Sequence, residues 1–144
     1  MASSVTEAPY TRDILRLAAA VPNRVGFEEI EGGVEMRSKT CGSRIRIDVK
    51  TDEQGRVQSV RQAIEACAFG QASAAIMARG ARGRDAGEIE ASCNRIARWL
   101  AGESELPEGW EDLDLLEPAL SRAGRHEAIL LPFRVLAAAM REIA

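Results

Sequence analysis

The chain has 144 residues, a formal net charge of -3 and three cysteines, and 46% of its residues are hydrophobic. This length and composition suit one globular domain that buries its own core. The acidic balance argues against nucleic-acid binding, and no apolar run is long enough to span a membrane. An odd number of cysteines argues against a disulfide framework and favours a reducing compartment. We therefore expect a cytoplasmic, single-domain protein over residues 1–144, with residues 1–8 flexible.

The first half of the chain predicts a helix followed by antiparallel strands. Residues 10–20 place apolar side chains at spacings of three and four, as in an amphipathic helix. From Val34 the period changes to two, and residues 44–50 alternate strictly between apolar and charged side chains. Such alternation is typical of antiparallel strands with one buried face.

A turn and a third strand complete a meander. Asp52 to Gly55 is a turn sequence in which the glycine can take a positive φ. Residues 57–64 form the third strand, and their alternation slips between Val57 and Val60, which indicates a β-bulge.

The second half of the chain is predicted to be helical. Helices are expected over residues 68–78 and 87–101, with a short helical piece over residues 113–120. A final helix is expected to hold Pro132 in its first turn, where a missing N–H costs little. Together the elements predict an α+β fold, in which N-terminal and C-terminal helices pack on one face of a three-stranded antiparallel sheet.

Cys41 and Cys67 are predicted to meet at one end of this sheet. Both are equidistant from Gln54 in the predicted turn, and residues equidistant from a hairpin turn pair across the ladder. Gly42 lets backbone N–H groups turn towards the Cys41 sulfur, and the positive end of the helix after Cys67 favours a thiolate there. Two thiolates suit a soft metal or sulfur chemistry, but two half-buried structural cysteines would show the same pattern.

The third cysteine is predicted to be structural. Cys93 lies on an apolar stripe with Ile89, Ile96 and Leu100 of a predicted helix. Because a free cysteine behaves as a small hydrophobe, Cys93 is expected to fill the core.

The segments around Cys41 and Cys67 resemble the NifU/IscU/SufU family of iron–sulfur cluster assembly scaffolds. In that family a Cys-Gly-Asp loop precedes a strand pair, and a Gly/Ala-Cys-Ala motif then starts a helix. The corresponding segments here are Thr40 to Ser43 and Ala66 to Ala74.

Further segments extend the resemblance over roughly residues 9–141. Tyr10 and the stretch from Pro22 to Gly26 are similar to the family's opening helix and its Asn-Pro-Arg-Asn turn. Residues 125–132 are similar to its closing Arg-x-x-Cys-Ala-x-Leu segment.

The resemblance implies a site of three cysteines and one aspartate that holds a nascent cluster or a zinc ion and receives sulfur from a cysteine desulfurase. Cys41 and Cys67 match two of these ligands, but Ser43 stands at the aspartate position and Ala128 at the third cysteine position. One chain therefore offers two good ligands, whereas zinc and 2Fe–2S clusters usually take four.

Several donors can supplement this pair. Within the chain the weaker candidate metal ligands are His126, Glu127 and Ser43. Outside the chain they are water, a small thiol, or the two cysteines of a second chain in a homodimer. His126 also fits a solvated loop residue, and Arg125 fits either an electrostatic anchor for an anionic cluster or a surface ion pair.

Three functions remain open from the sequence. The first is an iron–sulfur cluster assembly scaffold or carrier, a non-enzymatic protein that binds iron or a transient 2Fe–2S cluster through Cys41 and Cys67. Its partners would be a cysteine desulfurase and recipient apo-proteins. The second is a sulfur acceptor for such a desulfurase, and the third is an interaction module of the same fold without a cluster. The two missing ligands weigh against a zinc-bearing protein, whereas the retained cysteine pair favours the first function.

Overall fold

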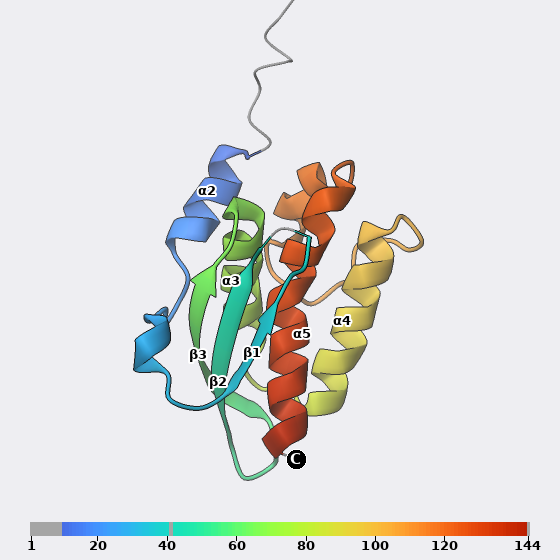
Figure 1. The fold of residues 1–144 in the computed structure, drawn as a ribbon. Helices are drawn as coiled ribbons and strands as arrows, with labels where there is room; N and C mark the ends of the chain where they lie inside the picture. The colour runs from blue at the N-terminus through green and yellow to red at the C-terminus, as the bar shows by residue number, and fades with distance from the viewer. Residues whose placement is uncertain (1–9, 41, 144) are drawn as a thin grey trace, which may run out of the picture.

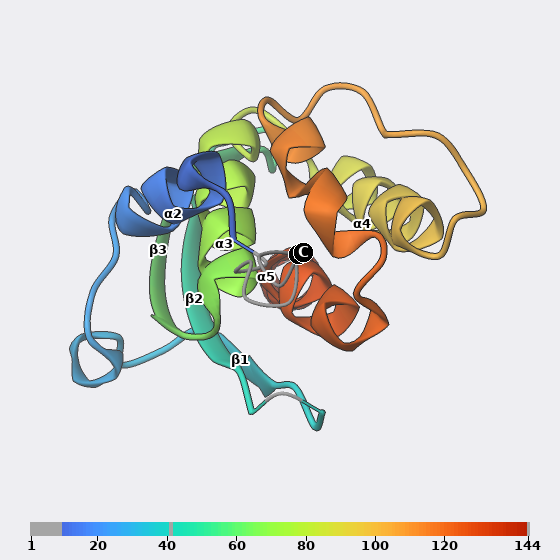
Figure 2. The same cartoon turned by 90° about the horizontal axis from the view of Figure 1, so that it is seen from above.

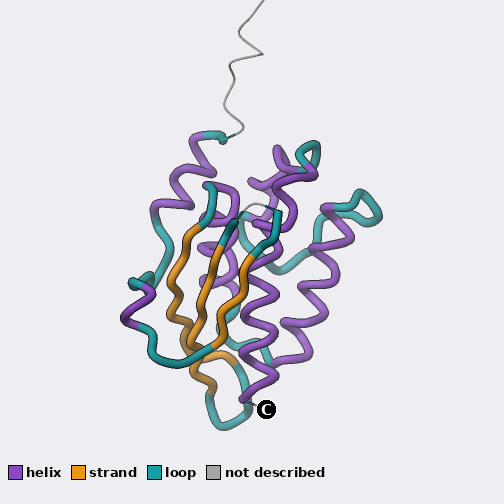
Figure 3. Tube along the Cα trace, in the orientation of Figure 1, coloured by secondary structure: helices purple, strands orange, loops and turns teal. Residues whose placement is uncertain are grey.

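The computed structural model describes residues 10–40 and 42–143. The predicted flexibility of residues 1–8 and the position of Cys41 therefore lie outside the described part of the chain. Figures 1 and 3 show a three-stranded sheet with long helices packed on one face. The predicted α+β architecture is confirmed.

The sheet is an antiparallel meander in the order β1-β2-β3. The strands are β1 (Val34–Arg37), β2 (Arg44–Thr51) and β3 (Val57–Glu65). Successive side chains of a strand point to opposite faces, so the alternation along β2 buries Ile45, Ile47 and Val49 on the helical side. Each fully buried aliphatic side chain stabilises the fold by about 1.5–3 kcal/mol.

The β2–β3 hairpin contains the predicted bulge. Next to the turn Thr51 pairs with Val57, but Lys50 pairs with Ser59, which leaves Gln58 as the extra residue. The slip in the alternation of this strand is therefore a real irregularity of the ladder.

Because of the bulge, residues equidistant from Gln54 do not pair across the hairpin as the sequence predicted. Beyond it Arg44 faces Glu65, one residue further along β3 than equidistance from Gln54 predicts. Both strand ends still lie at the same end of the sheet, because the shift is a single residue.

Two helices cover the sheet and two more pack on these. The helices are α2 (Arg12–Ala19), α3 (Ala68–Gly80), α4 (Ala86–Leu100) and α5 (His126–Ile143). α3 contacts β3, and α5 contacts β1 and β2, while α2 packs on α3 and α4 on α5. Figure 2 shows α3 and α5 next to the sheet and α4 beyond α5.

Local signals explain where these helices begin. Thr11 caps α2, since its hydroxyl accepts a hydrogen bond from the Ile14 N–H at 3.2 Å. Asp85 and Glu88 form a capping box, so α4 begins at Ala86, one residue before the predicted start.

The prediction that Pro132 lies in the first turn of the last helix is wrong. α5 already begins at His126, because the short helical turn η3 (Ala123–Arg125) leads directly into it. Pro132 therefore lies inside α5, where it cannot donate a hydrogen bond to the Ala128 carbonyl.

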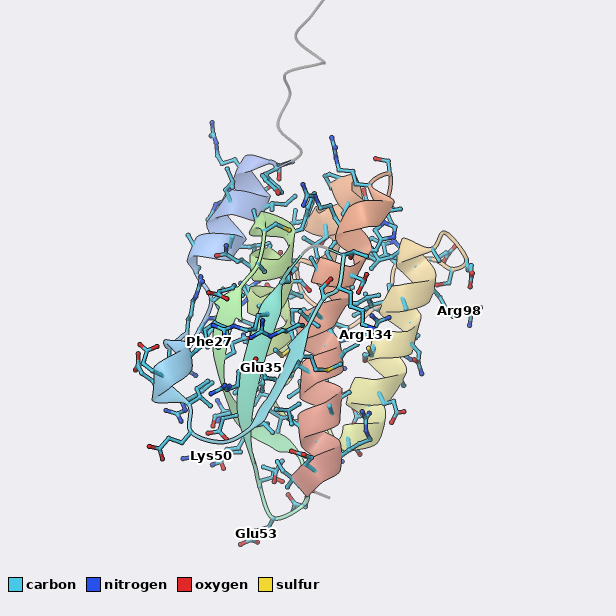
Figure 4. All side chains as sticks on the ribbon, in the orientation of Figure 1. Phe27, Glu35, Lys50, Glu53, Arg98 and Arg134 are labelled. Carbon is cyan, nitrogen blue, oxygen red and sulfur yellow. The ribbon has the colours of Figure 1, made fainter. Side chains whose placement is uncertain are left out.

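The outer face of the sheet is partly covered by the segment before β1. The η1 turn (Phe27–Glu29) places the Phe27 ring 3.6 Å from the Arg44 guanidinium carbon. Arg46 donates to the Ile30 carbonyl and pairs with Glu35 at 2.9 Å. Figure 4 labels Phe27 and Glu35 on this side, and Glu53 at the β2–β3 turn.

Aromatic side chains pack at both ends of the polar connection that follows α4. Trp99 and Trp110 are both buried, and the Trp110 ring meets Phe133 edge to face at 5.0 Å between centroids. The short η2 segment (Leu113–Ala119) follows and contacts α3. No described helix combines the length and apolar character that crossing a bilayer requires.

Candidate functional site

Four chain segments meet at the end of the molecule opposite the β2–β3 turn. They are the β1–β2 loop and the N-terminal ends of α2, α3 and α5, which lie at the top of Figure 1 and face the viewer in Figure 2. Helix N-termini carry partial positive charge, so this end favours bound anions and thiolates.

Cys67 occupies the N-cap position of α3. Its φ and ψ of -66° and 172° are extended, and its carbonyl accepts the Gln71 N–H at 2.9 Å. The Cys67 side chain makes no capping hydrogen bond to the helix and is half-buried. Cys67 therefore stands immediately before α3, where the strand and helix patterns placed it.

Tyr10 packs on the first turn of α3, close to Cys67, a placement that sequence reasoning missed. The Tyr10 ring meets Phe69 edge to face, with 5.1 Å between centroids. Burial raises the pKa of Tyr10, and the neighbouring Cys67 thiol raises this pKa further. Arg125 and Arg122 act in the opposite direction on the same pKa. In the sequence Tyr10 stood out only as part of the segment that is similar to the family's opening helix.

The β1–β2 loop is closed by backbone hydrogen bonds on both sides of residue 41. The Ser38 N–H donates to the Ser43 carbonyl at 2.8 Å, and the Gly42 N–H donates to the Ser38 carbonyl at 3.2 Å. Gly42 has a φ of +70°, as the sequence predicted for a glycine that turns the backbone. Cys41 belongs to this loop, but its own geometry lies outside the described residues.

Glu127 connects α5 to this loop. Its carboxylate accepts a hydrogen bond from the Thr40 hydroxyl at 2.6 Å and a longer one from the Ser38 hydroxyl at 3.4 Å. The structure thus brings one of the three weaker candidate ligands next to the residue that precedes Cys41.

The other two weaker candidates are engaged or buried. The His126 Nε2 atom lies 2.8 Å from the Ala119 carbonyl, so the half-buried imidazole has a partner in the protein and is not a solvated loop residue. Ser43 is only 2% exposed.

Ala128 is fully buried and does not face solvent at the site. A Cβ atom added at Gly70 would lie 3.5 Å from the Ala128 Cβ and 3.3 Å from its carbonyl oxygen. Gly70 thus lets the first turns of α3 and α5 approach closely, which keeps Cys67 and Glu127 at the same end of the molecule.

Cys93 is separate from this site. It is 9% exposed on α4, and burial raises the pKa of its thiol. Its predicted packing position is confirmed. Across residues 10–40 and 42–143, no group of three or more His, Cys, Asp and Glu side chains could hold a metal ion.

Comparison with known proteins connects this fold and site to a family. The family model described as the NifU-like N terminal domain matches residues 9–122. The crystal structure of a nitrogen-fixing NifU-like protein (N-terminal) from Brucella abortus is 32% identical to this chain, with a TM-score of 0.82 and 93% of each chain covered.

A second solved structure supports the fold alone. It is a candidate iron–sulfur cluster assembly scaffold protein for the SUF system from Fervidobacterium islandicum, 17% identical, with a TM-score of 0.79. The match covers 92% of this chain and 96% of the Fervidobacterium chain. The search among curated proteins gave no match. The family match and the Brucella structure together show that the chain belongs to the NifU-like N-terminal domain family.

Proposed function

We propose that this protein is an iron–sulfur cluster assembly scaffold or carrier, which binds iron or a nascent 2Fe–2S cluster as cargo through Cys41 and Cys67. The observation that supports this most is the placement of Cys67. Its half-buried thiol stands at the N-terminus of α3, at the end of the sheet that also carries the loop of residue 41. Family membership and the likeness to NifU-like structures point the same way.

The donor chemistry fits iron or a cluster better than a resident zinc ion. Thiolates are soft ligands that suit iron–sulfur chemistry, and a cluster usually takes four of them. Two cysteines of one chain supply half of this set, which matches a site that holds its cargo transiently. Structural zinc takes four protein ligands, and the serine and alanine at positions 43 and 128 do not provide the missing two.

Glu127 is the best additional donor among the three weaker candidates. Its carboxylate is already directed to the β1–β2 loop by Thr40. His126 is engaged with the Ala119 carbonyl and Ser43 is buried. We assign Glu127 as an oxygen ligand to iron before the cluster is complete, since carboxylate oxygens bind harder metal ions well.

The remaining cluster ligands come from outside the chain under this proposal. A homodimer with a two-fold axis through the cluster would use the same two cysteines twice and reach four thiolates. Sulfur would be delivered by a cysteine desulfurase, and the finished cluster would pass to recipient apo-proteins. The chain itself turns over no substrate in this scheme.

The test is anaerobic incubation of the full chain with ferric iron and sulfide, followed by visible absorption and analysis of iron and acid-labile sulfide. We expect the charge-transfer bands of a 2Fe–2S cluster and equal molar amounts of iron and acid-labile sulfide. A sulfur acceptor would instead take up sulfane sulfur from a desulfurase without forming a cluster. A chain that takes up neither would be an interaction module, and the proposal would be wrong.

A further inference from the structure

We propose that the outer edge of β1, together with the groove beside it, is a docking site for an extended acidic segment of a partner protein. The segment would add to the sheet as a fourth strand and would run between β1 and α4, over α5. This inference does not depend on a bound cluster or on the role of Cys41 and Cys67. It can therefore be tested on the metal-free chain.

The fold treats the two edges of the sheet differently. At the β3 edge the segment before η1 runs alongside the strand. There the Val25 N–H donates to the Gln62 carbonyl at 3.0 Å, and the Gln62 N–H donates to the Asn23 carbonyl at 3.4 Å. At the other edge, β1 pairs only with β2 within residues 10–40 and 42–143. One edge is thus already covered by an extended segment, and the other can accept one.

The backbone groups of Glu35 and Arg37 point to this outer edge. The Ser38 N–H donates to the Ser43 carbonyl at 2.8 Å, so these two residues form a hydrogen-bonded pair of the ladder. Such pairs alternate along an antiparallel ladder, which makes Met36 the next residue bonded to β2. The N–H and carbonyl groups of Glu35 and Arg37 therefore point away from β2, and no described residue forms a backbone hydrogen bond with them. These are the groups that an added strand uses.

A groove of about 250 Å³ lies beside this edge, on the helical side of the sheet. It is formed by β1, α4 and α5, and its lining includes Met36, Glu90, Cys93, Arg134, Ala137 and Arg141. Figure 4 labels Arg134 on α5, next to α4. A strand added to β1 would turn every second side chain toward this groove, because side chains alternate along a strand. The edge would hold the main chain of the segment while the groove takes its side chains.

The charge of the groove favours an acidic segment. Arg134 and Arg141 are exposed, and neither forms an ion pair with a carboxylate within the described part of the chain. The groove lining contains one acidic side chain, that of Glu90, so positive charge is in excess. Seven residues of helix separate the Cα atoms of the two arginines by roughly 10 Å. Two positive charges at this separation fit two acidic side chains of one extended chain better than a single small anion.

An alternating segment matches this separation. Side chains on one face of a strand recur about every 7 Å, so residues i and i+4 lie roughly 13 Å apart. Acidic residues at these two positions would reach Arg134 and Arg141 through flexible side chains. The residue midway between them would pack an apolar side chain on Met36 and Ala137. The ligand is therefore an extended segment with the pattern acidic-x-apolar-x-acidic.

The arrangement of the helices argues against a second copy of this chain as the occupant. A sheet continued through two β1 strands would place the helices of both copies on the same face. α5 contacts β1, α4 packs on α5, and α4 lines the groove beside Met36. α4 therefore occupies the space beside β1 that the helices of a second copy would need. A single added strand leaves both helices in place.

The binding test uses the full metal-free chain and a fluorescein-labelled peptide, Ser-Glu-Thr-Val-Thr-Glu-Ser, whose pattern is the same in both chain directions. Anisotropy titration should show saturable binding. A peptide with lysine in place of both glutamates should bind at least about tenfold more weakly. Arg134→Glu combined with Arg141→Glu should lower affinity by a similar factor. The matched control Arg82→Glu, at an exposed position between α3 and α4, should leave affinity unchanged.

A second pair of variants tests the main-chain contact. Arg37→Pro removes an edge N–H that no described residue bonds, and edge strands tolerate proline at such positions. Arg37→Ala removes the same side chain and keeps the N–H. Peptide affinity should be about tenfold lower in Arg37→Pro than in Arg37→Ala.

Hydrogen exchange in wild type gives the same information without a variant that has to fold. The amides of Glu35 and Arg37 should exchange quickly in the peptide-free chain and at least about tenfold more slowly with saturating peptide. The proposal is overturned by an absence of saturable binding up to about 1 mM peptide. It is also overturned by binding that survives the double arginine reversal or that leaves these two amides unprotected.

The other possible occupants have their own signature in the same measurement. Slow exchange of the Glu35 and Arg37 amides before peptide is added would mean that the edge is already covered. Protection that is lost on dilution would assign the edge to a second copy, and protection that persists would assign it to the chain's own residues. Either result would overturn the proposal of a partner segment.

Discussion

The Thr40 hydroxyl and the Glu127 carboxylate are joined by a hydrogen bond of 2.6 Å across 87 residues of sequence. This bond connects the first turn of α5 to the loop that contains Cys41. It therefore fixes the position of the one described carboxylate that our proposal makes an iron ligand, and it holds the loop at the same time.

Two substitutions separate these roles. Glu127→Gln keeps the shape and can still accept a hydrogen bond, but it removes the charge. Thr40→Val keeps the carboxylate and removes the hydrogen bond. We expect Glu127→Gln to lower ferrous iron affinity about tenfold with little loss of stability. Thr40→Val should cost about 1 kcal/mol in the free energy of unfolding and lower iron affinity less.

Iron titrations and urea unfolding of both variants test this prediction. Glu108→Gln, at an exposed position in the connection after α4, is the matched control and should change neither property. Unchanged iron affinity in Glu127→Gln would show that this carboxylate only holds the loop.

The core position of Cys93 predicts a purely structural effect of its replacement. Cys93→Ala removes a buried sulfur from the α4 stripe and should lower the free energy of unfolding by about 1 kcal/mol. Cluster or iron uptake per folded chain should stay the same. Loss of uptake in a variant that still unfolds cooperatively would place Cys93 in the chemistry and contradict our assignment.

Burial of Cys93 also predicts a dependence of stability on alkaline pH. The pKa of this thiol is raised above its ordinary value of 9.0, first by burial, with Arg134 opposing the shift. The folded chain therefore holds its proton to higher pH than the unfolded chain does. The associated stability is fully present below the ordinary pKa and is lost as pH rises through the folded pKa.

Urea unfolding of wild type and Cys93→Ala at about pH 8 and about pH 10 checks this sign. The loss of stability between the two pH values should be smaller in Cys93→Ala. An equal loss in both proteins would mean that other groups, Tyr10 among them, account for the dependence.

Gly70 provides a test of the close approach between α3 and α5. A Cβ atom at this position would lie 2.8 Å from the Ala66 Cβ, so Gly70→Ala forces the start of α3 to move. We expect the free energy of unfolding to fall by about 1–3 kcal/mol and the rate of Cys67 alkylation to change. Gly87→Ala, within α4 and with only one ordinary contact at 3.5 Å, should instead stabilise the protein by up to about 1 kcal/mol. A harmless Gly70→Ala would show that Ala66 and the Ala128 carbonyl leave room for a Cβ atom at this position.

The sequence was most informative where the structure is periodic. Strict alternation over residues 44–50 predicted a strand with one buried face, and the slip near Val57 predicted the bulge. The same bulge shows the limit of this reasoning, because a one-residue insertion shifts every pair beyond it. Pro132 was misplaced because the start of α5 depends on the preceding η3 turn, which carries no periodic signal.

The site could be predicted only in part. The N-cap position of Cys67 follows from the strand and helix patterns on either side. The contacts of Tyr10 with Phe69, and of Glu127 with Thr40, join segments that are distant in the chain. Such contacts depend on how α2 and α5 pack against α3 and the sheet, which no local pattern specifies.

The central claim is that one cysteine pair holds the cluster. The most direct test measures the iron content, the sulfide content and the native mass of four reconstituted proteins. These are wild type, Cys41→Ala, Cys67→Ala and Cys93→Ala. We predict one 2Fe–2S cluster per two chains, with dimer mass, in wild type and Cys93→Ala, and no stable cluster in the other two. A full cluster content in folded Cys67→Ala would contradict the account.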